Sequence, residues 1–158
     1  MDDQSWATYF RRLEDHLILL ESWTPEPPAP EAQRCEQSKH RTLGHLRACQ
    51  EQWLIAAEAF LEYESPSITL LHPWRQFEVH GYAFTVWAEH MEKFRSDRER
   101  WMTLSKADWN RDGKWNRKPD TISRLVWRLV SHEEYHLALF EGTMRAIIPH
   151  GAEGQVDG

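Results

Sequence analysis

Two histidines in the segment RLVSHEEYHLALFEG, His132 and His136, have the residue type and spacing to bind a metal ion. Because they are four residues apart, an α-helix would stack their imidazoles on one face, within reach of a common ion. Both interrupt an otherwise apolar stripe that includes Leu125, Leu129 and Phe140. Two stacked imidazoles are costly to bury unless their ring nitrogens are satisfied. The pair therefore predicts a metal site in the core, and the alternative is a hydrogen-bonded pair without an ion.

The residues HEEYH also match the H-E-x-x-H pattern, in which two histidines bind zinc and the glutamate activates water. The longer metzincin pattern is absent, because Leu139 and Gly142 stand where it needs a glycine and a third histidine. Glu133 is the one candidate catalytic residue, as a base or as a partner of the ligands. Its direction from the helix axis differs from that of the histidines by about a hundred degrees. The alternative for Glu133 and Glu134 is a solvated acidic pair.

A third ligand must come from upstream, and His45 on the inward face of the second expected helix is the best candidate. His90 is the reserve. Three imidazoles leave positions of the ion open for water or substrate, which is typical of a reactive site. Imidazole ligation alone admits zinc, nickel, copper or iron. Cys49, one turn after His45, is either a small core residue or a thiolate ligand.

Other polar and aromatic residues have simpler interpretations. Arg128 either points an anion-binding guanidinium into a pocket mouth or lies at the surface. Trp6 and Trp53 belong to inward stripes, whereas three other tryptophans fall in connections, namely Trp74, Trp109 and Trp115. The histidines without coherent spacing are expected at the surface, namely His16, His40, His72, His80 and His150.

Four segments carry the period of an amphipathic helix, and none carries a sustained alternation typical of a strand. Their expected ranges are 4–22, 42–62, from between 73 and 77 to 104, and 122–147. The fold class is therefore all-α, and four helices with two substantial connections describe a four-helix bundle. A long proline-rich loop, TPEPPAPEAQ, follows the first helix and could cross the length of a bundle.

The connection before the last helix, SKADWNRDGKWNRKPDT, carries turn signals at Asp112-Gly113 and Lys118-Pro119. A short helical turn is expected after Ser105, and Asp120 or Thr121 can cap the fourth helix. We expect one domain, with a bundle over residues 1–148 and a glycine-rich flexible tail over 149–158.

Composition and charge exclude several function classes. The net charge of −6 and the pI near 5.8 argue against general nucleic-acid binding, which needs an excess of lysine and arginine. The N-terminal MDDQSWATYF lacks the basic and apolar regions of a signal peptide, and no stretch approaches the length of a membrane span. Without a secretory signal, Cys35 and Cys49 are expected to be reduced thiols. These features predict a cytoplasmic protein without membrane or nucleic-acid partners.

His45 in TLGHLRACQEQW and the histidine pair in SHEEYHLALFEG together resemble the DinB-like family, over essentially the whole chain. The resemblance implies a four-helix bundle with one histidine near the start of the second helix and an H-x3-H pair on the fourth. It assigns one divalent metal ion, often nickel or zinc, to His45, His132 and His136. For some members it also implies transfer of a low-molecular-weight thiol to an electrophile.

The leading expectation is a metal-dependent transferase that activates a small thiol, because a bound divalent ion lowers the pKa of a thiol. One alternative is a metal-dependent hydrolase that uses a metal-bound water. Others are a metal-binding stress protein without turnover and a helical dimerisation module. A saturated ion with Cys49 or His90 as fourth ligand would favour the non-catalytic protein. We also expect that a homodimer could form through helix faces.

Overall fold

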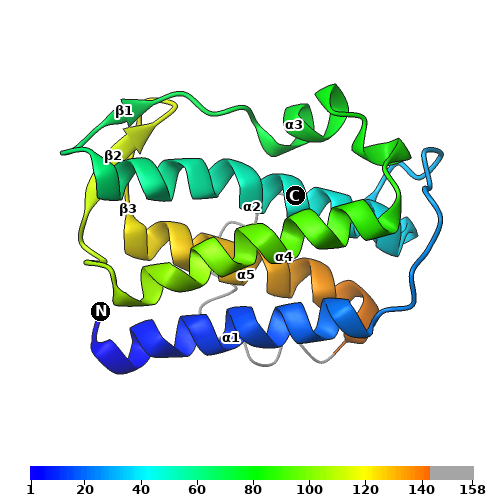
Figure 1. Ribbon diagram of the computed structural model, residues 1–158, viewed down its shortest axis with the longest axis horizontal. Helices are drawn as coiled ribbons and strands as arrows, with labels where there is room; N and C mark the ends of the chain where they lie inside the picture. The colour runs from blue at the N-terminus through cyan, green and yellow to red at the C-terminus, as the bar shows by residue number, and fades with distance from the viewer. Residues whose placement is uncertain (143–158) are drawn as a thin grey trace.

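Four long helices lie side by side in the computed structural model, which describes residues 1–142 (Figure 1). They are α1 (Asp3–Ser22), α2 (Lys39–Glu62), α4 (Trp87–Thr103) and α5 (Ile122–Glu141). α2 packs against α4 and α5, and α1 packs against α5 and α4. The shorter helical elements are α3 (Pro73–Val79) and the 3₁₀-helices η1 (Cys35–Gln37), η2 (Tyr82–Phe84) and η3 (Leu104–Lys106). The described chain is mostly helical, which is compatible with the predicted all-α class.

Two apolar clusters fill the interior between the long helices. One contains Trp6, Phe10, Trp53, Phe60, Trp101, Leu125 and Leu129 among its members. The other contains Leu20, Leu43, Leu46, Phe94 and Leu137 among its members. On α5, Ile122 to Val130 contribute to the first cluster and Leu137 contributes to the second, so residues 131–136 lie between them. The polar residues of this stretch are therefore surrounded by core, and the inward positions predicted for Trp6 and Trp53 are confirmed.

Side-chain caps fix where the long helices begin. The Asp2 carboxylate accepts a hydrogen bond from the Ser5 amide at 2.8 Å, and the Thr121 hydroxyl accepts one from the Arg124 amide at 3.2 Å. The predicted cap at Thr121 is thus confirmed. α2 begins at Lys39, three residues before the predicted start, because the Ser38 hydroxyl accepts from the Arg41 amide. The last residues of the predicted fourth helix and the predicted tail lie outside the described residues.

The predicted single third helix is wrong, since residues 73–104 form α3, η2 and α4 with a change of direction between them. The helical path is interrupted at Gly81, whose backbone lies in the left-handed region with φ 64°. Glycine reaches this region without steric cost, so the helical path ends there. As a result Val86, expected on the inward side, is 58% exposed, while His90 and Phe94 are fully buried.

A small sheet covers one end of the helices and corrects the expectation that the chain has no strands. β2 (Asp112–Trp115) and β3 (Lys118–Thr121) pair antiparallel, and β1 (Ser67–Ile68) pairs parallel with β2. The turn lies at Asn116 and Arg117, with φ 51° and 70°, rather than at either predicted dipeptide. Strands this short carry too few residues for an alternation to stand out.

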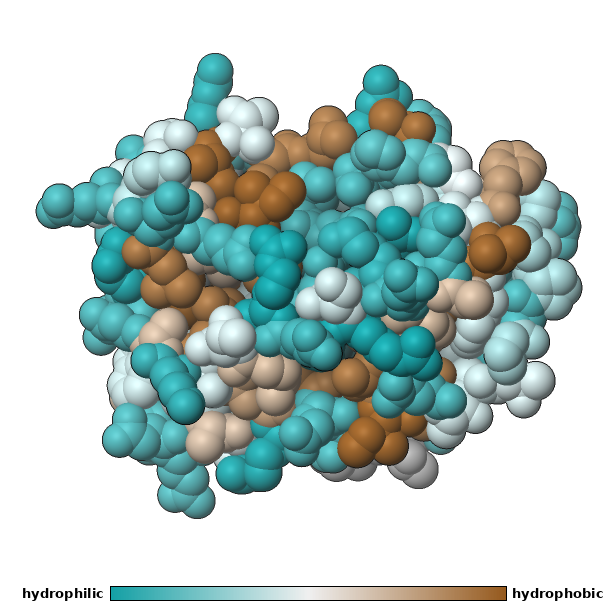
Figure 2. All heavy atoms as spheres, in the orientation of Figure 1, coloured by the Kyte–Doolittle hydropathy of each residue, from teal (hydrophilic) through white to brown (hydrophobic). Residues whose placement is uncertain are grey.

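Apolar side chains reach the surface in several places. On the face drawn in Figure 2 they form separate patches among hydrophilic residues. Four large ones that are more than half exposed belong to the segment from α3 to the start of α4, namely Trp74, Val79, Phe84 and Val86. Among the described helices, none combines the length and the apolar character that crossing a membrane requires.

Candidate metal centre

Side chains from α2 and α5 meet at the centre of the protein. His45 Nε2 lies 3.0 Å from His132 Nε2, and Cys49 Sγ lies 3.7 Å from each of these nitrogens. His45 and Cys49 are one turn apart on α2, so one helix face supplies both. All three side chains are buried. Three potential ligand atoms thus converge between two helices of the bundle.

The spacing of these three atoms fits a tetrahedral ion. Zinc binds imidazole nitrogen at about 2.0–2.1 Å and thiolate sulfur at about 2.3 Å, so two nitrogens are about 3.4 Å apart and a nitrogen and a sulfur about 3.6 Å apart. The two sulfur distances of 3.7 Å match this geometry, and the nitrogen pair at 3.0 Å would need only a small separation. Cys49 could therefore serve as a ligand, while it also packs within the first apolar cluster, so the structure is compatible with both interpretations of this residue.

A second group of potential ligands shares His45. Cys35 in η1, His45 and His136 offer one ligand atom each within 4.8 Å of one another. The His136 ring centroid lies 4.7 Å from that of His45 and 4.5 Å from that of His132. Within residues 1–142, neither ring nitrogen of His136 has a hydrogen-bond partner although the side chain is buried. Such orphaned nitrogens are expensive to bury, and a metal ion would satisfy one of them.

The three histidines named from the sequence are therefore brought together, but not as one compact set of three ligand atoms. Their rings lie side by side, while the atoms close enough to share an ion form two groups, each of which includes a cysteine. Sequence reasoning missed Cys35, because it lies in a short 3₁₀-helix after the proline-rich loop, where no helical period points to it.

Burial keeps the imidazoles in the form that binds metals. Burial, together with the neighbouring His136, lowers the pKa of His45 to about 3, and burial lowers the pKa of His136 to about 4. Both rings are thus neutral at pH 7 and can donate a lone pair. Burial also raises the pKa of the Cys35 thiol to about 11, partly offset by the nearby charge of Arg41. The Cys35 thiol stays protonated unless a cation binds beside it.

Glu133 and Glu134 are fully buried, which corrects their interpretation as a solvated acidic pair. Glu133 accepts from Arg98 and contacts His16 Nδ1 at 2.9 Å. Glu134 accepts from Arg12 at 2.5 and 2.9 Å and contacts His16 Nε2 at 3.0 Å. Both carboxylate oxygens of Glu133 are thus engaged by α1 and α4, and Glu133 belongs to neither of the two ligand groups.

Two histidines expected at the surface are in fact buried. His16 lies between Glu133 and Glu134, and His40 contacts the Thr85 carbonyl oxygen at 2.6 Å through Nε2. Burial lowers the pKa of His16, but hydrogen bonds to the two glutamates outweigh it and raise the pKa above the ordinary value. The polar partners of both residues come from distant parts of the chain, so the local sequence pattern did not indicate their burial.

His90, the reserve ligand, uses both ring nitrogens within the protein. Its Nε2 lies 3.0 Å from the Tyr82 carbonyl oxygen, and its Nδ1 lies 3.2 Å from Arg47 Nη1. Arg128, the other polar candidate, lies over the rings of Trp53 and Trp115 at 5.9 and 5.5 Å. Neither residue belongs to the two groups that could hold an ion.

A pocket of about 300 Å³ reaches the candidate centre from outside. His45 and Cys35 form part of its wall, and the remainder comes from α2, α3 and η2, including Arg41, Phe77 and Phe84. The pocket has enough volume to admit a small molecule, since ligand pockets start at about this volume. A molecule in the pocket would lie next to two potential metal ligands.

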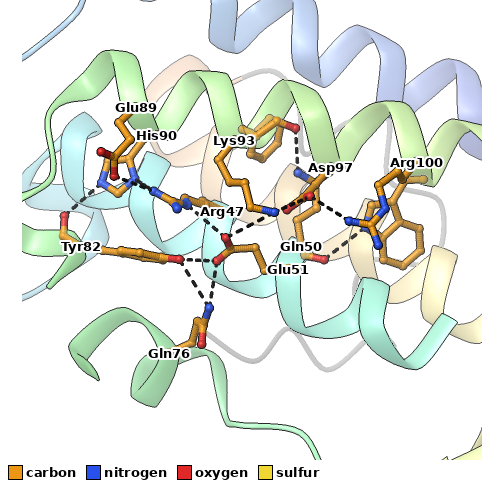
Figure 3. Close-up of polar contacts among 12 residues, drawn as sticks. Arg47, Gln50, Glu51, Gln76, Tyr82, Glu89, His90, Lys93, Asp97 and Arg100 are labelled. Atoms are coloured by element: carbon orange, nitrogen blue, oxygen red, sulfur yellow. Dashed lines mark hydrogen bonds and ion pairs between the residues drawn. The ribbon is translucent and has the colours of Figure 1, made fainter. Parts of the chain in front are cut away.

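A polar network anchors α3 and η2, which form the outer wall of the pocket, to α2 (Figure 3). Tyr82 donates its hydroxyl to Glu51 at 2.6 Å, and Gln76 donates to the same oxygen at 3.2 Å. Arg47 donates to the other Glu51 oxygen at 3.2 Å. Burial and the Glu51 carboxylate both raise the pKa of Tyr82, so its hydroxyl remains a donor.

Comparisons with known proteins leave the site as the main guide to function. No protein-family model, curated protein or solved structure matches this chain. The described residues contain His and Cys groups that could hold a metal ion, in a mostly helical protein.

Proposed function

We propose that this protein is a DinB-like metal-dependent transferase, with a four-helix bundle that holds one divalent ion and uses it to activate a low-molecular-weight thiol. The observation that carries the proposal is the convergence of His45, Cys49 and His132 at separations of 3.0, 3.7 and 3.7 Å. Imidazole and thiolate ligands together suit zinc, and nickel is the second choice.

Metal binding explains these side chains better than a hydrogen-bonded histidine pair does. A hydrogen bond between His45 and His132 would account for their nitrogen separation of 3.0 Å. It would not account for His136, whose two buried ring nitrogens have no partner among residues 1–142. A divalent ion would give His45, Cys49 and His132 a common role, and His136 belongs to the second group, which shares His45.

When bound, the ion would hold a small thiol as its thiolate, which is the reactive form. The chain's own residues decide what reaches the ion. The pocket provides the entrance beside His45, and Cys35 stands in its wall. Because Cys35 keeps its proton at neutral pH, it does not compete as a nucleophile in the protein without an ion.

Metal binding is tested by elemental analysis of protein purified without an affinity tag, with His132→Ala as the variant and His80→Ala, an exposed histidine, as the matched control. We expect about one ion per chain in wild type and control, and a large loss in His132→Ala. Substoichiometric metal in all three proteins would overturn the proposal.

Thiol transfer is tested by the conjugation of 1-chloro-2,4-dinitrobenzene with a panel of small thiols, including cysteine and glutathione. Wild type reconstituted with zinc or nickel should accelerate at least one reaction, and the protein stripped of metal should not. Absence of metal-dependent acceleration with every thiol, in protein with full metal content, would contradict transferase activity. A panel of ester and amide substrates then tests the hydrolase alternative.

A second candidate, a metal-binding protein without turnover, is favoured by Cys49. If Cys49 is the fourth ligand beside the three histidines, whose rings lie next to one another, the four positions of a tetrahedral site are filled. Such a site would retain its metal but exclude a substrate thiol. The conjugation experiment separates the two functions, because the non-catalytic protein binds one ion and shows no acceleration.

A further inference from the structure

The pocket beside His45 contains one side chain suited to bind an anion. Arg41 projects from the first turn of α2 into its wall. Its Nη1 donates to the Ala32 carbonyl oxygen at 3.0 Å, and its guanidinium lies over the Phe77 ring at 4.9 Å. The backbone of the proline-rich loop and an aromatic ring thus fix the guanidinium plane from two sides. Among residues 1–142 no carboxylate pairs with Arg41 within 4.0 Å.

The other pocket walls are largely apolar and partly open. Phe77 is buried, whereas Trp74 and Phe84 are 54% and 72% exposed. Exposed aromatic rings at a pocket rim cost free energy in water and favour a ligand that covers them. The polar network around Glu51 holds α3 and η2 in place, so these rings are positioned before a ligand arrives (Figure 3).

One acidic residue, Glu78, also lines the pocket and must be weighed against Arg41. Its side chain is 63% exposed and forms an ion pair with Arg75 at 3.0 Å. Water and Arg75 therefore screen its charge. Arg41 is only partly exposed, and it lies one turn before His45 on α2, at the inner end of the pocket. Arg41 is therefore the charged side chain of the pocket wall that remains for an anionic ligand.

We infer that this pocket binds a small organic carboxylate with an apolar or aromatic body. The carboxylate pairs with Arg41, whose planar guanidinium matches it in a bidentate manner, and the body covers Phe77, Phe84 and Trp74. The volume of about 300 Å³ limits the ligand to a small molecule. This inference names a substrate class for the proposed function, and it rests on that function for the reactive position beside His45.

The probe pair 3-(4-fluorophenyl)propanoate and 3-(4-fluorophenyl)propanamide tests the inference, because the two differ only in charge at the head group. Binding to the full chain is followed by ¹⁹F NMR line broadening in metal-loaded and metal-stripped protein. We expect the carboxylate to bind roughly tenfold or more tightly than the amide in both forms. Equal binding of the two probes, or binding of neither, would overturn the inference.

Variants then assign the preference to Arg41. Arg41→Gln should lower the carboxylate affinity about tenfold or more and leave the amide affinity unchanged, whereas Arg124→Gln, a 70% exposed arginine outside the pocket, should change neither. Phe84→Ser, at a position that is 72% exposed, should weaken the binding of both probes to a similar extent. If Arg41→Gln does not fold, Arg41→Lys replaces it and should retain only part of the preference.

The metal dependence separates this inference from the proposed function. Carboxylate binding that disappears on removal of the ion and survives in Arg41→Gln would mean direct coordination, and would overturn the role of Arg41. Charge-selective binding that depends on Arg41, in a protein that elemental analysis finds free of metal, would support the pocket and refute the metal centre. A full metal content with no preference for the carboxylate probe would support the metal centre and refute the anion-binding pocket.

Discussion

At the scale of single residues, Cys49 changes what kind of ion the site would hold. Three imidazoles admit several transition metals, whereas a thiolate among them favours zinc and the softer metals. Cys49 Sγ lies 3.7 Å from both His45 Nε2 and His132 Nε2, so it can join them without movement of the backbone. Cys35 is the competing thiol, and it belongs to the group with His136.

Cobalt substitution distinguishes the two cysteines. Co²⁺ bound by thiolate absorbs in the near ultraviolet through charge transfer from sulfur, and this absorption is absent with nitrogen ligands alone. If the ion lies between α2 and α5, Cys49→Ser should abolish the band and weaken metal binding about tenfold or more, whereas Cys35→Ser, the matched control, should retain the band. The reverse pattern would place the ion with Cys35 and His136.

The burial of His90 predicts how the free energy of unfolding depends on pH. Burial, together with the nearby Arg47, lowers its pKa to about 4, although the Tyr82 carbonyl acts in the opposite direction. The neutral ring donates through Nε2 to that carbonyl and accepts at Nδ1 from Arg47. As the pH falls from about 6.5 to 4, the unfolded chain gains a proton here that the folded chain does not. The free energy of unfolding should therefore decrease over this window, by on the order of 2 kcal/mol from His90.

His90→Gln tests this prediction, because glutamine retains a donor and an acceptor but does not titrate. Urea unfolding of both proteins at several pH values between 4 and 7 should give a shallower decline in the variant. His16 acts in the opposite direction, since its raised pKa adds stability at low pH that is lost as the pH rises through that pKa. This contribution is common to both proteins and cancels in their difference. Parallel curves would contradict the role of His90.

At the scale of elements, the small sheet determines how the end of α2 is packed. Gly113 in β2 lies directly against Phe60 of α2, and an added Cβ would meet Phe60 carbons at 2.4 and 2.5 Å and the Pro66 oxygen at 2.9 Å. The Lys114 amide donates to the same Pro66 oxygen at 2.7 Å, which joins β2 to the chain after α2. Only glycine permits this close approach of strand to helix.

Gly113→Ala should consequently be destabilising by about 1–3 kcal/mol, because the new methyl group must displace a buried ring or the backbone. Lys114→Ala, on the exposed side of the same strand, is the matched control and should cost well under 1 kcal/mol. Chemical denaturation of both variants provides the measurement. Equal stabilities would show that the hairpin does not pack against α2 as described.

At the scale of the whole molecule, a buried polar and ionic network joins all four long helices. Arg98 on α4 donates to Glu133 on α5, to Gln50 on α2 at 2.6 Å and to the Leu13 carbonyl oxygen on α1 at 2.8 Å. His16 on α1 continues the network to both glutamates of α5. Its members are fully or almost fully buried, so each charge depends on the others for compensation.

Removal of one partner leaves an uncompensated charge, so Arg98→Met should lower the free energy of unfolding by about 3–5 kcal/mol. The double variant Arg98→Met/Glu133→Leu should lose less than the sum of the two single losses, with a coupling of about 1–3 kcal/mol. Arg95→Met, on the same helix but paired with the exposed Glu21, should cost less than about 1 kcal/mol. Additive losses in the double variant would refute direct pairing of Arg98 with Glu133.

The sequence by itself determined the local features of this protein. The period of apolar residues predicted the helices over residues 4–22 and from 122, and it placed His132 and His136 on the inward face of the latter. It could do so because helical periodicity depends only on residues within a few turns. The same periodicity placed His45 on the inward face of α2, but its role as a ligand depended more on the family resemblance, and Cys49 was recognised there with two possible roles.

The tertiary structure alone decided which distant residues share a site. Cys35 reaches His45 and His136 only after the proline-rich loop has crossed to α2, and no local pattern records that path. His16 meets Glu133 across 117 residues of sequence, which turned an expected surface histidine and a solvated acidic pair into a buried network. The physical reason is that burial of charge depends on compensation, and the compensating groups lie on other helices.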